Sequence, residues 1–403
     1  MLSTSLKKQF REELEQIIAY WKTYAVDKKN GGFAGQRDHY NRLVPGAPKG
    51  IILNTRILWT FSAVSRFYNT KTLKFYCDRA YDYIGRYFRD IHNGGVYWMV
   101  GTQGNPLNKR KQVYAQAFAV YALSEYALYS ERDEPRQWAL ELFRLIETHS
   151  RDRERGGYIE AFAEDWSPLE DMRLSDKDEN TAKTMNTHLH LLEAYTTLYR
   201  LSGEPEVKKS LEDLLKLFFD RFLGTDGHFV LFFDEDWNPE GAKVSFGHDI
   251  EAAWLLAEAA KVLEDEVWIT ATRKAALKVA DTFLAEACDS NFGVNNEMDT
   301  HSGETDTDRH WWPHAEAMAG LYYACMISGD ISYCRAMEKI WEYTRKYLID
   351  RENGEWFFRT DHKGVPYTDE NKIGPWKCPY HNSRAFIQLL TWSGNPPVRL
   401  QDV

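Results

Sequence analysis

The sequence predicts an all-α protein, a closed (α/α)6 barrel of six helical hairpins, and three observations support this prediction. A turn of glycine and an aromatic or apolar residue recurs six times along the 403 residues. Each interval between turns has room for two helices, and its apolar residues recur at helical spacing. Unusual polar and aromatic side chains stand at the start of every second helix. One catalytic domain over residues 1–403 accounts for all three.

The repeat is marked by its turns. Their glycines, spaced 61 to 71 residues apart, are Gly31, Gly94, Gly156, Gly227, Gly293 and Gly354. An acidic residue precedes most of the turns, and the aspartates are Asp27, Asp90, Asp152, Asp226, Asp289 and Asp350. The residues after the glycines are typical of short extended segments. We therefore expect each turn to end one helix and to be followed by a β-like segment.

Twelve helices are predicted from the spacing of apolar residues. Their ranges are 5–24, 51–69, 72–89, 112–130, 134–150, 184–202, 205–223, 248–264, 266–288, 313–329, 331–349 and 378–394. Short links such as 202–205 and 328–330 make neighbouring helices antiparallel. The six even-numbered helices then run in one direction, so their N-termini gather at one end. Six hairpins could also form an open solenoid, but the side chains at these N-termini favour closure.

Composition and charge exclude several classes of protein. The formal net charge of −10 argues against a nucleic-acid partner, because binding a phosphate backbone depends on clustered lysine and arginine. No stretch reaches the roughly 20 apolar residues of a membrane span, and the first residues do not resemble a secretory signal. We expect a cytoplasmic protein without a membrane partner. Its five cysteines are odd in number and widely spaced, which predicts reduced thiols.

The side chains that are unusual on helices gather at the six even-numbered N-termini. They are Arg56, Tyr114, Asn186 with His190, His248 with Glu251, Trp311 with Trp312 and Glu316, and Trp376 with His381. Functional groups that converge at one mouth of a barrel form a cleft with rigid walls, which suits a preorganised site. Helix N-termini also stabilise developing negative charge. The pattern therefore predicts a single active site.

Two histidines share a helical face with a polar group. His248 and Glu251 are three residues apart, so we expect the carboxylate to orient the imidazole and to raise its pKa towards neutrality. A charge pair at the helix N-terminus is the structural alternative. Asn186 and His190 are four apart, whereas His188 points elsewhere. For His190, the alternative is a core histidine.

Other residues at this mouth have a structural and a functional interpretation. Three tryptophans precede helices in polar segments and could stack on sugar rings or fill the core, namely Trp311, Trp312 and Trp376. Arg56, among apolar neighbours, could form a buried ion pair or hold an anionic oxygen. His310 and His314 have the spacing of metal ligands, but no third ligand accompanies them at motif spacing. We expect no metal.

With these residues in hand, the sequence is found to resemble the cellobiose 2-epimerase branch of the N-acylglucosamine 2-epimerase superfamily. The resemblance runs over essentially the whole chain and is carried by the segments 50–56, 94–99, 183–186, 247–251, 311–312 and 374–382. The last segment is the most specific, because N-acylglucosamine epimerases differ there. The resemblance therefore implies unmodified disaccharides rather than acetamido sugars, in an (α/α)6 barrel that needs no nucleotide, metal or other cofactor.

The resemblance also assigns roles to residues. It implies that His381 and His248 are the acid/base pair and that His190 assists ring opening and proton handling. The implied substrate contacts are Arg56, Tyr114 and Asn186, on oxygens of the reacting sugar; Trp311, Trp312 and Trp376, as stacking surfaces; and Asp178, in a variable loop. Glu251 and Glu316 would support the histidines. Which of the adjacent tryptophans faces the sugar is left open.

The implied reaction interconverts glucose and mannose at the reducing end of β-1,4-linked disaccharides such as cellobiose, mannobiose or lactose. Inverting carbon 2 requires ring opening and a cis-enediol, and thus two proton carriers, with Arg56 stabilising the enediolate oxygen. Alternatives are an aldose–ketose isomerase, an N-acylglucosamine 2-epimerase, a glycoside hydrolase that uses Glu251 and Glu316, and a non-catalytic binding scaffold. We expect a monomer or weak homodimer whose partner is the reducing disaccharide.

Overall fold

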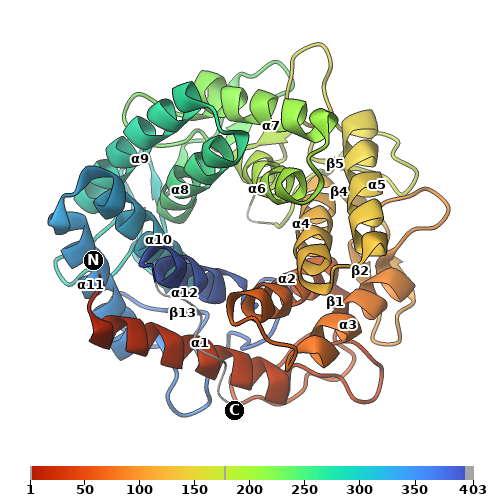
Figure 1. Ribbon diagram of the computed structural model, residues 1–403, viewed down its shortest axis with the longest axis horizontal. Coiled ribbons are helices and arrows are strands. Elements are labelled where there is room, and N and C mark those ends of the chain that lie inside the picture. Colours follow the sequence, from red (N-terminus) through yellow and green to blue (C-terminus); the bar gives the residue numbers. More distant parts are fainter. Residues whose placement is uncertain (1, 177, 395–403) are drawn as a thin grey trace.

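The computed structural model describes residues 2–176 and 178–394. Within them, twelve α-helices form two concentric rings (Figure 1). The inner ring consists of α2 (Ile51–Phe67), α4 (Val113–Ser130), α6 (Met185–Ser202), α8 (Phe246–Leu263), α10 (Trp311–Ser328) and α12 (Tyr380–Trp392). The outer ring consists of α1 (Thr4–Tyr24), α3 (Lys74–Tyr83), α5 (Asp133–His149), α7 (Pro205–Leu217), α9 (Glu266–Glu286) and α11 (Ile331–Tyr343). The closed ring confirms the predicted (α/α)6 barrel.

The two rings differ in how their helices are buried. Inner helices are buried nearly all round, as in α4, where every residue from Val113 to Ala127 is buried. Outer helices are amphipathic, and α5 buries one face only, which includes Trp138 and Leu142. Three outer helices end in one wider π-helical turn, namely Ile84–Phe88 after α3, Phe218–Phe222 after α7 and Thr344–Leu348 after α11. The predicted ranges 72–89, 205–223 and 331–349 include these turns.

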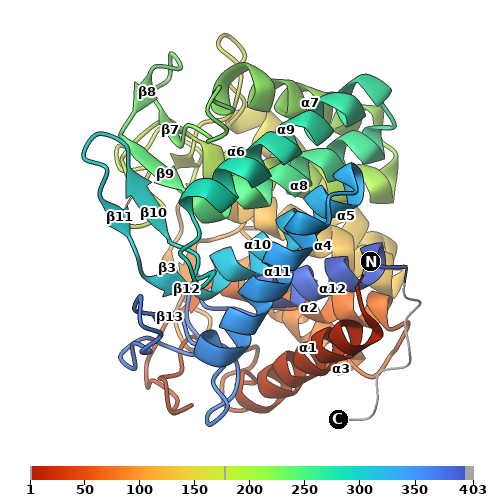
Figure 2. The same cartoon turned by 90° about the vertical axis from the view of Figure 1, so that its left-hand side faces the viewer.

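Short antiparallel strands gather at one end of the barrel (Figure 2). They are β1 (Lys49–Gly50), β2 (Met99–Val100), β3 (Pro106–Asn108), β4 (Lys111–Gln112), β5 (Ala161–Phe162), β6 (Lys183–Thr184), β7 (Phe232–Phe233), β8 (Pro239–Glu240), β9 (Lys243–Ser245), β10 (Glu297–Asp299), β11 (Thr305–Asp306), β12 (Arg309–His310) and β13 (Arg359–Thr360). The strand before an inner helix pairs with the strand after the next glycine turn, as in β1 with β2 and β12 with β13. A bridge between Arg37 and Ile373 joins the last repeat to the first.

Buried basic residues hold the glycine turns against the inner helices. The ion pairs are Lys49–Asp27 at 2.9 Å, Lys111–Asp90 at 2.6 Å, Lys183–Asp152 at 2.8 Å, Arg309–Asp289 at 2.6 Å and Lys372–Asp350 at 2.8 Å. Burial raises the pKa of such a carboxyl, but for Asp90 the hydrogen bonds from Lys111 and from turn amides prevail and lower it to about 2. Five of the six aspartates noted in the sequence therefore anchor the framework.

A second anchor uses a side chain in the first turn of an inner helix. It accepts a hydrogen bond from the backbone amide that follows a glycine turn: Gln116 from Val96 at 2.8 Å, His188 from Tyr158 at 2.9 Å, Asp249 from Phe229 at 3.0 Å and His314 from Val294 at 3.1 Å. Burial lowers the pKa of both His188 and His314 to about 3. These two histidines are neutral structural acceptors, which accounts for their position on helices.

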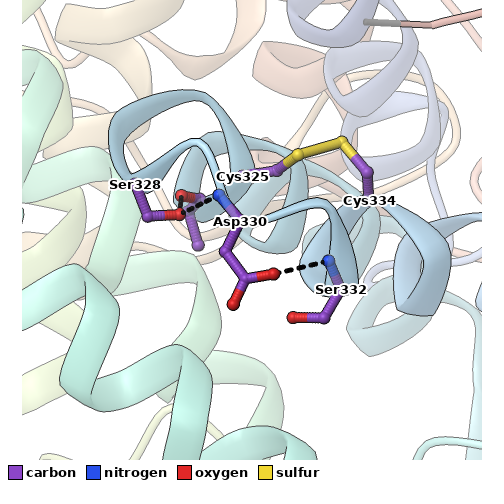
Figure 3. The surroundings of a disulfide bond; sticks show 6 residues. Cys325, Ser328, Asp330, Ser332 and Cys334 are labelled. Carbon is purple, nitrogen blue, oxygen red and sulfur yellow. Dashed lines mark hydrogen bonds between the residues drawn. A yellow bond between two sulfur atoms is a disulfide. The ribbon is translucent and has the colours of Figure 1, made fainter.

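The prediction of five reduced thiols is wrong for one pair. Cys325, near the end of α10, and Cys334, in the first turn of α11, form a disulfide (Figure 3). The two helices are antiparallel and are joined by a tight turn at Gly329, so residues at similar distances from the turn face each other, and the Cα atoms lie 5.6 Å apart. Cys77, Cys288 and Cys378 are free thiols. Among the described residues, no helix is long and apolar enough to cross a bilayer.

Candidate active site

The predicted site residues lie at the N-terminal ends of the inner helices, at the barrel end that carries the strands. Arg56 on α2 donates a hydrogen bond of 2.7 Å from Nη2 to the Tyr114 hydroxyl on α4. Its guanidinium lies over the Phe118 ring, 4.3 Å from the centroid, and over Tyr380 at 5.0 Å. Among the described residues, no carboxylate forms an ion pair with Arg56. The guanidinium is therefore a buried cation held by aromatic and neutral groups, with its charge available to an anionic oxygen.

His190 on α6 lies against Tyr114 and Phe118, two rings that also contact Arg56. Its ring meets Tyr114 edge-on at 5.1 Å and Phe118 at 4.7 Å. Its Nδ1 lies 3.0 Å from Oε2 of Glu193, one turn along the same helix. Burial opposes ionisation of Glu193, but Arg384 and His190 together lower the pKa of this carboxyl to about 2. His190 thus has a carboxylate partner on one nitrogen, and this carboxyl is ionised at neutral pH.

His381 on α12 has a carboxylate partner from another helix. Its Nδ1 lies 2.7 Å from Oε1 of Glu316 on α10. Burial lowers the pKa of His381, and the positive charges of Arg56, Arg384 and His190 lower it further, while Glu251 acts in the opposite direction. The predicted support of a histidine by Glu316 is present in the structure, and it fixes the orientation of the imidazole.

The expected pairing of His248 with Glu251 is wrong. Nδ1 of His248 lies 2.8 Å from Oγ of Ser245, at the start of α8, whereas Glu251 bonds to Arg384 and approaches Nδ1 of His381 at 3.9 Å. Burial lowers the pKa of His248 to about 4, and the charge of Glu251 offsets this only in part. The expected rise in the pKa of His248 is therefore also wrong. Although His248 and Glu251 share a helical face, they form no hydrogen bond, because the Ser245 hydroxyl bonds to His248 and the Arg384 guanidinium bonds to Glu251.

The structure distinguishes the three tryptophans. Trp312 is half-buried, and its ring lies 4.8 Å from that of His248 and 5.5 Å from that of His381. Trp311 is only 3% exposed and packs against Phe358 at 4.8 Å. Trp376 is half-buried, at 6.1 Å from Tyr114. Trp312 is thus the indole shared by two site histidines, and Trp311 belongs to the core behind it.

Arg384 is a site residue that the sequence prediction missed. It lies on α12, one turn after His381, is fully buried, and donates hydrogen bonds to Glu193, Glu251 and Glu316. We call these three carboxylates the acidic cluster. An arginine among apolar residues on an inner helix is the same signal that identified Arg56, and it could have identified this one.

Two carboxylates of the acidic cluster lie close enough to His381 for the three residues to be considered as metal ligands. Single ligand atoms of Glu251, Glu316 and His381 all lie within 4.8 Å of one another. Nη2 of Arg384 already donates to one oxygen of each of these two carboxylates. A divalent cation would therefore have to displace a guanidinium that neutralises the same charges.

A cavity of about 320 Å³ opens beside His248. Asn186 and Asp178 line it as well, so three predicted site residues meet there. Oδ1 of Asn186 has no hydrogen-bond partner among the described residues, which leaves it free to accept from a ligand. Asp178 instead accepts hydrogen bonds from the amide and hydroxyl of Ser175, at 2.9 and 2.8 Å, so its carboxylate also holds its own loop.

These features define the class of protein. Histidines from three helices, a buried arginine and a half-buried indole line one mouth of an (α/α)6 barrel, an arrangement suited to moving protons on a sugar, and the class is a carbohydrate isomerase. The model of the N-acylglucosamine 2-epimerase (GlcNAc 2-epimerase) family matches residues 31–385. The chain therefore belongs to this family.

Similar proteins are found in several bacteria. The chain is 42% identical to cellobiose 2-epimerase of Bacteroides fragilis, over 96% of this chain and 98% of that protein. It is 35% identical to cellobiose 2-epimerase of Dictyoglomus turgidum, over 96% and 98%. The solved structure of cellobiose 2-epimerase from Bacillus thermoamylovorans superposes with a TM-score of 0.92 at 35% identity, covering 97% of this chain and all of that one. The match extends over the whole barrel.

Proposed function

We propose that this protein is a cellobiose 2-epimerase, which interconverts glucose and mannose at the reducing end of β-1,4-linked disaccharides. The observation that carries the proposal is the contact of His248 and His381, from different helices, with the same Trp312 ring. Two imidazoles around one aromatic surface can flank one carbon of a sugar stacked there. The similarity to cellobiose 2-epimerases over the whole chain supports the choice of substrate.

In the proposed mechanism, the disaccharide binds with its reducing ring against Trp312 and opens with the assistance of His190. One of His248 and His381 removes the proton from carbon 2, which is acidic because it is next to the aldehyde. Arg56, assisted by Tyr114, stabilises the enediolate oxygen. The other imidazole, which must be protonated at this step, returns its proton to the opposite face of the planar cis-enediol and is left neutral, which inverts carbon 2.

Other contacts are proposed for the remainder of the substrate. The free Oδ1 of Asn186 would accept a hydrogen bond from a sugar hydroxyl, and Trp376 would cover the reducing ring. Asp178 would contact the second sugar from its loop, since it lines the cavity beside His248. We propose only a supporting role for Trp311, because it is buried behind Trp312.

A glycoside hydrolase is disfavoured by the arrangement of its candidate carboxylates. Hydrolysis needs two carboxyl groups about 5–9 Å apart on either side of the scissile bond. Glu251 and Glu316 bond to the same nitrogen of Arg384, so no sugar ring fits between them. An aldose–ketose isomerase shares the enediol and differs only in where the proton returns, so ketose is the expected side product.

The function is tested by incubating the protein with cellobiose and analysing the products by chromatography and NMR. The proposal predicts a disaccharide with mannose at the reducing end and an equilibrium reached from either epimer. Release of monosaccharide would identify a hydrolase, and a ketodisaccharide as the main product would identify an aldose–ketose isomerase. If cellobiose, mannobiose and lactose are all left unchanged, the proposed function is wrong.

We also propose that residues 1–403 act as one catalytic domain, in the cytoplasm, as a monomer or weak homodimer without a nucleic-acid or membrane partner. The net charge of −10 supports the absence of nucleic acid. Light scattering at several protein concentrations tests the assembly state, and a dimer that persists at nanomolar concentration would contradict it.

A further inference from the structure

The acidic cluster, Glu193, Glu251 and Glu316, places three carboxylates around one guanidinium. Arg384 is fully buried and donates from Nη1 to Glu193 and from Nη2 to Glu251 and Glu316. The guanidinium also lies over the rings of Tyr380, at 4.4 Å, and Trp254, at 4.8 Å. Its position is therefore fixed from several sides, and it has no contact with the cavity beside His248.

Two members of the acidic cluster each hold a site histidine by Nδ1. Glu193 lies 3.0 Å from Nδ1 of His190, and Glu316 lies 2.7 Å from Nδ1 of His381. A carboxylate at Nδ1 places the proton on that nitrogen and leaves Nε2 as the basic atom that faces the substrate. The tautomers of His190 and His381 therefore depend on the ionised forms of two buried carboxylates, Glu193 and Glu316.

Burial by itself would protonate these carboxylates. A carboxyl group removed from water favours its neutral form unless a cation or hydrogen bonds compensate. Burial does raise the pKa of Glu316, and Arg384 is the first group that opposes the rise. For Glu193, Arg384 is the strongest group that opposes the effect of burial. One guanidinium thus overcomes the effect of burial at Glu193, together with His190 and Tyr380, and offsets it in part at Glu316.

We infer that Arg384 is a positioning residue for the epimerisation, which sets the tautomer and orientation of His190 and His381 together through Glu193 and Glu316. This inference rests on the proposed function. It assigns to one side chain on α12 the coupling of two histidines from two different helices. Without Arg384, each imidazole would lose its ionised acceptor and would populate both tautomers.

The test compares Arg384→Met and Arg384→Lys with the matched control Arg309→Met. Arg309 is equally a buried arginine on a carboxylate, Asp289, but its ion pair holds a glycine turn. For Arg384→Met with cellobiose, we expect kcat to fall roughly 10²-fold, the scale seen when the partner that orients a functional histidine is lost, with KM within about threefold because no substrate contact changes. Arg384→Lys should recover part of kcat. Arg309→Met should lower stability without lowering kcat selectively over KM.

Nitrogen-15 NMR of the histidine rings provides a readout that does not need turnover. In the wild type, we expect His190 and His381 as pure Nδ1–H tautomers with strongly hydrogen-bonded protons. In Arg384→Met both signals should be lost, and Arg309→Met should retain them. If Arg384→Met does not fold, the same ring signals are compared with the wild type in Arg384→Lys and in the two single variants Glu193→Gln and Glu316→Gln.

Three outcomes would overturn the inference: unchanged Nδ1–H signals in the Arg384 variants, a loss of kcat no larger than in Arg309→Met, or a loss that appears in KM alone. Failure of the proposed function has a different result. A wild-type protein that leaves cellobiose unchanged would refute the epimerase, while the ring signals would still decide whether Arg384 controls the two histidines.

Discussion

At the scale of residues, burial lowers the pKa of two site histidines, His248 and His381. His248 has only the Ser245 hydroxyl on Nδ1, and its pKa is lowered to about 4. His381 has a carboxylate, yet its pKa is also lowered by burial and by nearby arginines. His248 is therefore a neutral base at neutral pH, ready to accept a proton from carbon 2.

This has a consequence for the pH dependence of kcat/KM. A base must be neutral to act, so activity is present above the pKa of His248 and is lost as the pH falls through about 4. We predict that kcat/KM for cellobiose holds from pH 7 down to about pH 5 and falls below that, as measured by initial rates. An acid limb centred at the ordinary histidine value of about 6.5 would contradict the prediction.

The adjacent tryptophans should respond differently to substitution. Trp312→Ala removes the surface that two histidines share, so we expect at least a roughly tenfold loss of kcat/KM with little change in stability. Trp311→Ala leaves a cavity in the core and should cost about 3–5 kcal/mol in the free energy of unfolding. Steady-state kinetics and denaturant unfolding of both variants provide the check. The assignment of roles is wrong if the two variants exchange these effects.

Sequence reasoning found which residues lie at the mouth of the barrel but not which of them touch. Periodicity places His248 and Glu251 on one face, yet the partner of each comes from elsewhere, Ser245 and Arg384. Spacing along one helix carries no information about groups that a neighbouring helix brings close. Arg384 acts across three helices, so its partners are visible only in the structure.

At the scale of elements, a buried ion pair holds the start of α8. His228, after the fourth glycine turn, lies 2.7 Å by Nδ1 from Asp249 and 3.1 Å by Nε2 from Glu286. Burial would lower the pKa of His228, but these two carboxylates prevail and raise it to about 9. Asp249 follows His248 directly, so this pair fixes the turn of helix that carries a proposed catalytic base.

The pair makes a pH-dependent contribution to stability. Because the pKa of His228 is raised on folding, its stabilisation is complete below about pH 6.5, the unfolded value, and is lost as the pH rises through about 9. We predict that His228→Gln lowers Tm at pH 6 and that the gap to the wild type closes by pH 10. The exposed His362→Gln is the control and should show no gap. A gap that is constant with pH would contradict the assignment.

The Cys325–Cys334 disulfide also stabilises the arrangement of helices, since it links α10 to α11. It closes a loop of about ten residues, which predicts a stabilisation of roughly 2–3 kcal/mol. For a chain of 403 residues this corresponds to about 3 °C in Tm. Cys325→Ser should show this loss, and thiol titration of the unreduced, denatured wild type should detect three thiols. Five thiols would show that the pair is reduced in solution.

The twelve helices were predictable because each carries a long apolar pattern. When the three π-helical turns are counted with their helices, the structure places all twelve within a few residues of the expected ranges. The disulfide was missed because cysteine counting ignores geometry. Cys325 and Cys334 stand at equal distances from the helices' facing ends, Ser328 and Ile331, and a helical hairpin brings such positions together. That symmetry is present in the sequence.

At the scale of the whole molecule, the same contacts between a glycine turn and an inner helix recur around the barrel. In most repeats a buried lysine or arginine binds a turn aspartate, and a first-turn side chain caps a turn amide. The bridge between Arg37 and Ile373 closes the circle. Closure of the barrel could be predicted from the gathering of functional groups at one end. The ion pairs and amide hydrogen bonds of the glycine turns could not be predicted, because they connect residues that lie about 20 or more positions apart.

The central claim is that the inner helices bring His248 and His381 to one carbon atom. The most direct measurement is the deuterium content at carbon 2, read by NMR after incubation with cellobiose in deuterium oxide. We predict deuterium at carbon 2 of the mannose-ended product for the wild type, and neither epimerisation nor deuterium uptake for His248→Phe and His381→Phe, which still bind disaccharide. Product that keeps its original hydrogen, or turnover by either variant, would contradict the claim.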